Sequence, residues 1–233
     1  MKIKLFGLLL SISLVFGCEI TDILTDSGLG GPTETEVIMG LKEALQIGTI
    51  KGVDVVGQAD GYFKNAVIKI LMPEGAQSVV NTLRDLGLGN LVDQAVLSIN
   101  RAAEDAASAA KPIFVNAIKQ MTIADAWTIL RGDDNAATNY FKSKTSQQLY
   151  NAFKPKIETS LDKVGATRHY GDVMETYNQI PFVQPVNTDL SDHVTNKAID
   201  GLFHMIEQEE KNIRTNISAR VTDLLRKVFG AQD

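Results

Sequence analysis

The sequence predicts an all-α protein whose single helical-bundle domain contains about eight to ten helices. Apolar residues recur at helical spacing along most of the chain, and helix start and stop signals separate these stretches. Residues 66–73 and 181–186 instead combine β-branched residues or prolines, which favour an extended backbone. We therefore expect at most one short extended or β segment beside the helices.

The helices can be placed from their start and stop signals. Thr33 and Glu36 form a capping box, so the first helix begins there and runs to about Val56. Pro, Thr, Asn and Asp at helix starts and Gly at helix ends delimit the others. These are expected at about residues 73–87, 90–110, 112–121, 122–132, 133–142, 145–164, 168–178, 190–214 and 217–229.

Two of these helices lie close together between residues 133 and 164. Asp133 or Asp134 can cap the first, and Thr145 can start the second. Pro155 lies inside the second stretch and has no backbone N–H, so it should kink or split that helix.

Residues 1–17 have the parts of a bacterial lipoprotein signal peptide. A basic start precedes an apolar stretch of 12 residues, Leu5 to Phe16, which is too short to span a bilayer. The sequence VFGC then places the single cysteine, Cys18, where lipoprotein signals are cut and acylated with palmitate-type chains, although Phe16 is bulkier than usual at its position. The alternative is an ordinary secreted protein with a chance cysteine near its cleavage site.

Cleavage before Cys18 leaves 21 basic and 28 acidic residues, a net charge of −7. This balance argues against a nucleic-acid partner and against electrostatic adhesion to anionic lipid, so the membrane is a partner through the acyl chains alone. Glu19 favours the periplasmic face of the outer membrane, because Asp at that position favours retention in the inner membrane. With Cys18 acylated, no disulfide is possible.

The mature chain divides into two parts. Residues 18–32 are rich in glycine and end at a proline, which predicts a flexible tether behind the lipidated cysteine. Residues 33–233 carry the helical signals and predict one domain, whose core must supply its stability.

The first predicted helix has small residues at every fourth position: Gly40, Ala44, Gly48 and Gly52. Glycines destabilise a helix, by roughly 0.5–1 kcal/mol each relative to alanine, so close packing should offset them. The favoured interpretation is that another helix of the bundle packs against this seam. The functional alternative is a groove that binds an apolar ligand or a partner helix.

A stripe of charged residues follows one face of the helix at 190–214. Asp200, His204 and Glu207 have a spacing that can hold a metal or perform acid–base chemistry. The stripe contains one histidine and continues into Lys211 and Arg214, so alternating surface charges explain it better.

Two further polar groups have structural interpretations. Asp133, Asp134 and Asn139 do not follow the EF-hand pattern, so helix capping is favoured over calcium binding. Arg101 and Asp105 are spaced as a surface ion pair, unless the face that also carries Asn100 and Glu104 is buried as a polar network.

No catalytic motif is present in the sequence. We find no nucleophile elbow, no Cys–His pair and no zinc-protease motif, so no catalytic residue, metal or cofactor is predicted. The C-terminal stretch "ISARVTDLLRKVF" is amphipathic, with Val221 and Leu225 opposite Arg220 and Lys227, and we expect it to dock on the bundle rather than on a membrane.

Several long stretches resemble a bacterial domain-of-unknown-function family, number 4197. They are "GLKEAL", "INRAAEDAA", "QMTIADAWTILRGDDNAATNYF", "KAIDGLFHMIEQEEKNIR" and "LLRKVFG", and together they cover nearly the whole mature chain. The resemblance implies a helical cell-envelope protein, often behind a lipoprotein or secretory signal. It implies no activity, cofactor or catalytic residue.

The sequence therefore predicts an envelope lipoprotein whose helical domain is a non-enzymatic binding or interaction module. Its partner would be a periplasmic protein or an apolar ligand. The alternative is a hydrolytic or metal-dependent enzyme that uses the Asp200/His204/Glu207 face or the Asp133/Asp134/Asn139 cluster.

Overall fold

A computed structural model describes residues 32–85, 87, 89–163, 165, 167, 170 and 189–231. These residues form an all-α structure without β-strands, as the sequence predicts. The predicted signal peptide, nearly all of the tether, and the predicted segments at 168–178 and 181–186 lie outside the described residues, apart from Tyr170. The helices are α2 (Glu34–Val56), η1 (Glu74–Ala76), α3 (Gln77–Asp85), α4 (Gly89–Ala107), α5 (Ala110–Gln120), α6 (Ile123–Leu130), α7 (Ala136–Lys163), α9 (Leu190–Thr215), η2 (Ile217–Ala219) and α10 (Asp223–Gly230).

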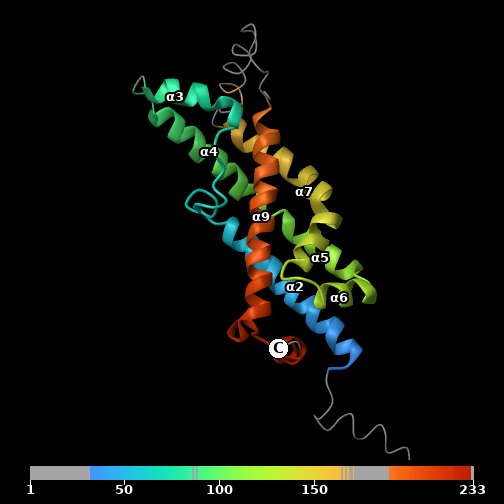
Figure 1. The fold of residues 1–233 in the computed structure, drawn as a ribbon. Helices are drawn as coiled ribbons and strands as arrows, with labels where there is room; N and C mark the ends of the chain where they lie inside the picture. Colours follow the sequence, from blue (N-terminus) through green and yellow to red (C-terminus); the bar gives the residue numbers. More distant parts are fainter. Residues whose placement is uncertain are drawn as a thin grey trace, which may run out of the picture.

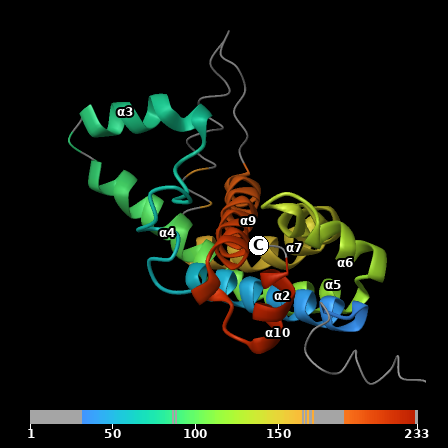
Figure 2. The same cartoon turned by 60° about the horizontal axis from the view of Figure 1, so that its bottom comes forward.

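Helices α2 and α9 run antiparallel through the middle of the molecule (Figure 1). Helices α5, α6 and α7 pack on one side of this pair, and α10 lies across α2 near the C-terminus (Figure 2). Helix α3 packs on α4 and projects from the bundle in both views. None of the helices in the described part of the chain is long and apolar enough to cross a membrane.

The centre of the core joins three helices through aromatic rings. Phe114 of α5 contacts Phe141 of α7 and Phe203 of α9 edge to face, with ring centroids 5.3 and 6.1 Å apart. All three side chains are buried. Edge-to-face pairs of this kind add specific geometry to the apolar area that they remove from water.

The small-residue seam of α2 faces α9 and α10. A β-carbon added at Gly40 would lie 2.7 Å from Val228 Cγ2 of α10, and one added at Gly52 would lie 3.2 Å from Ile206 Cγ1 of α9. At Gly48 the nearest atom, in Ile213, would be 3.6 Å away. The missing side chains therefore let α9 and α10 lie close against α2.

Helix α7 is a single helix where the sequence predicts two. Thr145 lies inside it, and Pro155 neither ends nor splits it. The physical reason is an apolar stripe at four-residue spacing that continues past the proline, which itself points to solvent. Burial of this stripe offsets the roughly 3 kcal/mol that an interior proline costs a helix. Its members are Phe141, Thr145, Leu149, Phe153, Ile157 and Leu161.

The C-terminal segment docks on the bundle, as expected, but its polarity differs from the prediction. Leu225 and Val228 of α10 are buried against α2. Arg220 is also buried, and Val221 is exposed, which reverses their expected sides. Arg220 turns inward because its guanidinium donates hydrogen bonds to the carbonyl oxygens of Ile213 and Arg214 at the end of α9.

Alanine substitutions in the seam should have opposite effects on stability at Gly48, where there is room for a methyl group, and at Gly40, where there is none. Gly48→Ala should stabilise the fold by about 0.5–1 kcal/mol, because alanine is the better helix former and the new methyl group finds ordinary contact distances. Gly40→Ala should destabilise it by about 1–3 kcal/mol, since Val228 must move. Urea unfolding followed by circular dichroism measures both, and equal effects would contradict the assigned packing.

The capping box of α2 predicts a pH dependence. A hydrogen bond from Lys227, followed by bonds from the backbone and hydroxyl of Thr33, lowers the pKa of Glu36 from 4.5 to about 2. A lowered pKa in the folded state stabilises the fold above the ordinary pKa, and this stabilisation is lost as the pH falls towards 2. The difference in unfolding free energy between the native chain and Glu36→Gln should therefore be largest near neutral pH and vanish near pH 2. A difference that stays constant across a pH series of urea unfolding curves would argue against this contact.

Candidate functional site

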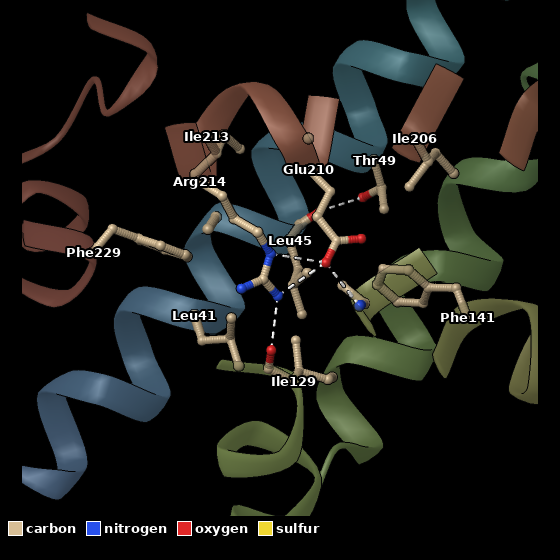
Figure 3. Close-up of a pocket in the computed structure, with 13 residues that line it drawn as sticks. Leu41, Leu45, Thr49, Ile129, Phe141, Ile206, Glu210, Ile213, Arg214 and Phe229 are labelled. Atoms are coloured by element: carbon tan, nitrogen blue, oxygen red, sulfur yellow. Dashed lines mark hydrogen bonds and ion pairs between the residues drawn. The ribbon is translucent and has the colours of Figure 1, made fainter. Parts of the chain in front are cut away.

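A buried ion pair between Glu210 and Arg214 of α9 joins three helices (Figure 3). The Arg214 guanidinium lies 3.0 Å from the Glu210 carboxylate, one helical turn away. The side chains are largely buried, with Glu210 6% exposed and Arg214 12% exposed. Charges removed from water in this way must be paired and hydrogen-bonded to be tolerated.

Glu210 caps the N-terminus of α7. Its carboxylate accepts hydrogen bonds from the backbone N–H groups of Ala137 and Thr138, each at 2.9 Å, and from the Thr138 hydroxyl at 2.8 Å. The prediction that Asp133 or Asp134 caps this helix is therefore wrong. Both aspartates are exposed, and a carboxylate from a distant helix takes the free N–H groups because it approaches them from inside the bundle.

Arg214 completes the arrangement at the end of α6. Its guanidinium donates to the carbonyl oxygens of Ile129 at 2.7 Å and Leu130 at 3.3 Å. A cation thus lies at the negative end of α6, and an anion lies at the positive end of α7. The pair, which we call the α9 clasp, holds the turn between α6 and α7 against α9.

The α9 clasp borders a small cavity beneath the glycine seam. The cavity has a volume of about 20 Å³, which is the space of one water molecule and too small for an organic ligand. Its wall includes Ala44 and Gly48 of the seam, while Gly40 and Gly52 are covered by Val228 and Ile206. Helices of the same chain thus cover the residues that the sequence offers as a possible groove.

A second polar network anchors residues 57–73 to α4. The Asn100 side chain accepts from the backbone N–H of Ile70 at 2.9 Å and donates to its carbonyl oxygen at 2.8 Å. The Glu104 carboxylate accepts from the backbone N–H groups of Tyr62 and Phe63, at 3.1 and 3.2 Å. Asn100 and Glu104 are both buried, so this face is the polar network that the sequence left as an alternative.

Arg101 belongs to the same network and does not pair with Asp105. Its guanidinium bonds Glu104 and, at 2.6 Å, Asp60, which has a positive φ of 72°. Asp105 instead accepts from Ser160 of α7 at 2.9 Å. Arg101 turns towards Asp60 because the loop brings a second carboxylate within reach, which a surface helix pair cannot offer.

Tyr62 fixes the loop to α9. It is fully buried, and its hydroxyl donates to the carbonyl oxygen of Ala198 at 2.6 Å. Burial, with a smaller contribution from the Glu104 charge, raises the pKa of this hydroxyl, so it stays a hydrogen-bond donor. Gly201 makes room for the ring, since a β-carbon there would lie 2.7 Å from it.

The anchored loop forms one wall of an open groove of about 440 Å³. Its backbone between residues 66 and 73 is irregular and pairs with no β-strand among the described residues. Val67 and Leu71 are 71% and 58% exposed, so the loop presents apolar surface to solvent. The opposite wall is α9, which contributes polar side chains from four positions: His193, Lys197, Asp200 and His204.

The groove contains part of the charged stripe predicted from the sequence. Asp200 and His204 line it, while Glu207 lies outside it. Within the described residues, no group of three or more His, Cys, Asp or Glu side chains is arranged to hold a metal ion. His193 Nε2 lies 3.0 Å from the Leu71 carbonyl oxygen and so joins the two walls.

The cluster at residues 133–139 does not converge on a site. Asp133 and Asp134 are exposed, and the Asn139 side chain donates to that of Asn135, which lies just before α7. Nothing in this geometry brings the three side chains around one point.

Sequence reasoning missed Glu210, His193 and Lys197. Glu210 had a readable signal, because it falls on the apolar stripe of α9 that also contains Ile206 and Ile213. A charge at a core position predicts a buried partner. His193 and Lys197 gave no such signal, since their role depends on a loop more than 100 residues away in the sequence.

Removing Glu210 should destabilise the fold strongly. Glu210→Ala leaves Arg214 buried without its anion and the N-terminus of α7 without its cap, so a loss of about 3–5 kcal/mol is expected. Lys51→Ala is the matched control, because it removes an exposed ion pair to Glu209 on the same helix and should cost less than about 1 kcal/mol. Chemical unfolding of both variants tests the contrast, and a small effect of Glu210→Ala would refute the assigned role.

Comparison with known proteins agrees with the resemblance predicted from the sequence. A family model described as "Protein of unknown function (DUF4197)" matches residues 31–230, which include every helix of the structure. No curated protein and no solved structure matches the chain. The chain therefore belongs to the DUF4197 family.

Proposed function

We propose that this protein is a lipoprotein of the bacterial envelope whose helical domain binds an apolar ligand with a polar end. The observation that carries the binding role is the groove between residues 67–77 and α9. Its volume of about 440 Å³ falls in the range of ligand pockets, which are commonly about 300–1,000 Å³.

The two walls of the groove suit the two ends of such a ligand. Val67 and Leu71 offer exposed apolar surface on the loop, and burying it against a ligand would be favourable. His193, Lys197 and His204 on α9 offer hydrogen-bond donors or positive charge to a polar head. The polar network at Asn100 and Glu104 holds the loop wall in place, so the groove is formed before binding.

The location belongs to the same proposal. The sequence VFGC supports acylation of Cys18, and residues 19–32 would connect the anchor to α2. We place the domain at the periplasmic face of the outer membrane. A periplasmic protein is the alternative partner for the groove.

Ligand binding is tested by native mass spectrometry of the purified mature chain, before and after incubation with fatty acid or phospholipid. The native chain should carry or take up lipid, and Val67→Asp with Leu71→Asp should reduce uptake by about tenfold or more, since both changes place charge on the apolar wall. Leu91→Asp, at a half-exposed position of α4, is the control and should leave uptake unchanged. No uptake by the native chain would reject the ligand role and favour a protein partner.

Anchoring is tested by Cys18→Ala. The native chain should incorporate labelled palmitate and fractionate with membranes, whereas the variant should do neither, because acyl chains supply the membrane affinity. Unchanged fractionation of the variant would rule out a lipid anchor at this residue.

A further inference from the structure

The chain enters the bundle at the end where α9 finishes. Glu34 and Glu36, in the first turn of α2, contact Trp127 of α6 at 3.5 Å and Lys227 of α10 at 2.6 Å. Arg214 ties the last turn of α9 to the end of α6. The start of α2, the end of α9, α6 and α10 therefore share one end of the molecule, which we call the tether end (Figure 1).

Elements at the tether end carry exposed apolar side chains. Seven large apolar side chains are exposed in the described residues, and four of them belong to elements at this end. They are between 55% and 66% exposed: Met39 of α2, Ile123 of α6, Ile217 of η2 and Val221 before α10. Val221 directly follows Arg220, whose side chain turns inward and leaves Val221 on the outside.

The chain between Cys18 and α2 is short. Residues 19–32 number 14, and a chain of that length reaches at most about 50 Å when fully extended. An acylated Cys18 would therefore keep the tether end near the lipid at an effective concentration in the millimolar range. At that effective concentration, contacts that are too weak to bind a free protein to a bilayer are sufficient to hold the tether end on the lipid surface.

We propose that the tether end lies on the lipid surface, with Met39, Ile123, Ile217 and Val221 in the headgroup region. This inference rests on the proposed acylation of Cys18. The contact is apolar rather than electrostatic, because the mature chain carries a net charge of −7 and acidic side chains such as Glu34 and Asp223 lie at the same end.

The orientation places the groove away from the membrane. His193 lies near the start of α9, 22 residues before Thr215 at the tether end. The part of α9 that lines the groove runs from His193 to His204, so at 1.5 Å per residue it lies about 16–33 Å along the helix from Thr215. The groove would then open towards the periplasm, where a ligand or its carrier can reach it.

Site-directed spin labelling of the full lipidated chain in phosphatidylcholine vesicles tests the orientation. Cys18 is the only cysteine and is blocked by its acyl chains, so Ile217→Cys and Val67→Cys each give a single labelling site. Both positions are exposed, at 66% and 71%. The label at 217 should be at least about threefold less accessible to a water-soluble relaxation agent than the label at 67.

A charge variant then tests the apolar contact. With the label at Ile123→Cys, adding Val221→Glu and Met39→Glu should restore accessibility to the level seen in detergent. Adding Val67→Glu and Leu71→Glu, which lie in the groove, should change nothing. All four substitutions are at exposed positions, so the midpoint of urea unfolding should not shift, and unfolding curves of the variants check this.

The outcomes separate the inference from the proposed function. If Cys18 carries its acyl chains by intact mass and the labels at 217 and 67 are equally accessible, the orientation is wrong and the anchor stands. If Cys18 is not acylated, both fail. Protection at 217 that persists in detergent and grows with protein concentration would mean that a second copy, rather than lipid, covers the tether end.

Discussion

The close approach of α2 and α9 is the constraint on which the rest of the structure depends. Gly52 leaves space for Ile206, so α2 and α9, which are more than 130 residues apart in the sequence, meet with little between them. This contact fixes which face of α9 points inward. The rotation of α9 about its axis then decides three contacts. Glu210 reaches the start of α7, and Ala198 and Gly201 come to lie against Tyr62.

Buried polar groups then secure the irregular parts of the chain. Glu210 and Arg214 satisfy the free backbone groups at the turn between α6 and α7, and Asn100 and Glu104 do the same for the loop before α3. Such groups are costly to bury unless every partner is present, so they specify one arrangement. The loop forms one wall of the candidate groove, and hydrogen bonds to Asn100 and Glu104 of α4 hold its shape.

Much of the fold was predictable because local signals were strong. Thr33 and Thr122 each form a capping box in the structure, and α2 and α9 end within a residue or two of their predicted limits. Prediction failed between residues 133 and 164 because a continuous buried stripe outweighed Pro155, and the weight of that burial depends on which helices pack there. Only one wall of the candidate groove was predictable, because the spacing of Asp200 and His204 marks them as a candidate site and nothing in the sequence places the loop opposite them.

The sequence by itself determined the all-α class, the family and the boundaries of most helices, because capping, helix spacing and composition are local properties. It also contains the VFGC signal on which the proposed anchor depends. Only the tertiary structure decided which charged groups meet. Arg101 turned to Asp60 instead of Asp105, and Glu210 displaced Asp133 and Asp134 as the cap of α7. In both cases the partner is far away in the sequence and close in space, and at Glu210 burial also strengthens the electrostatic interaction.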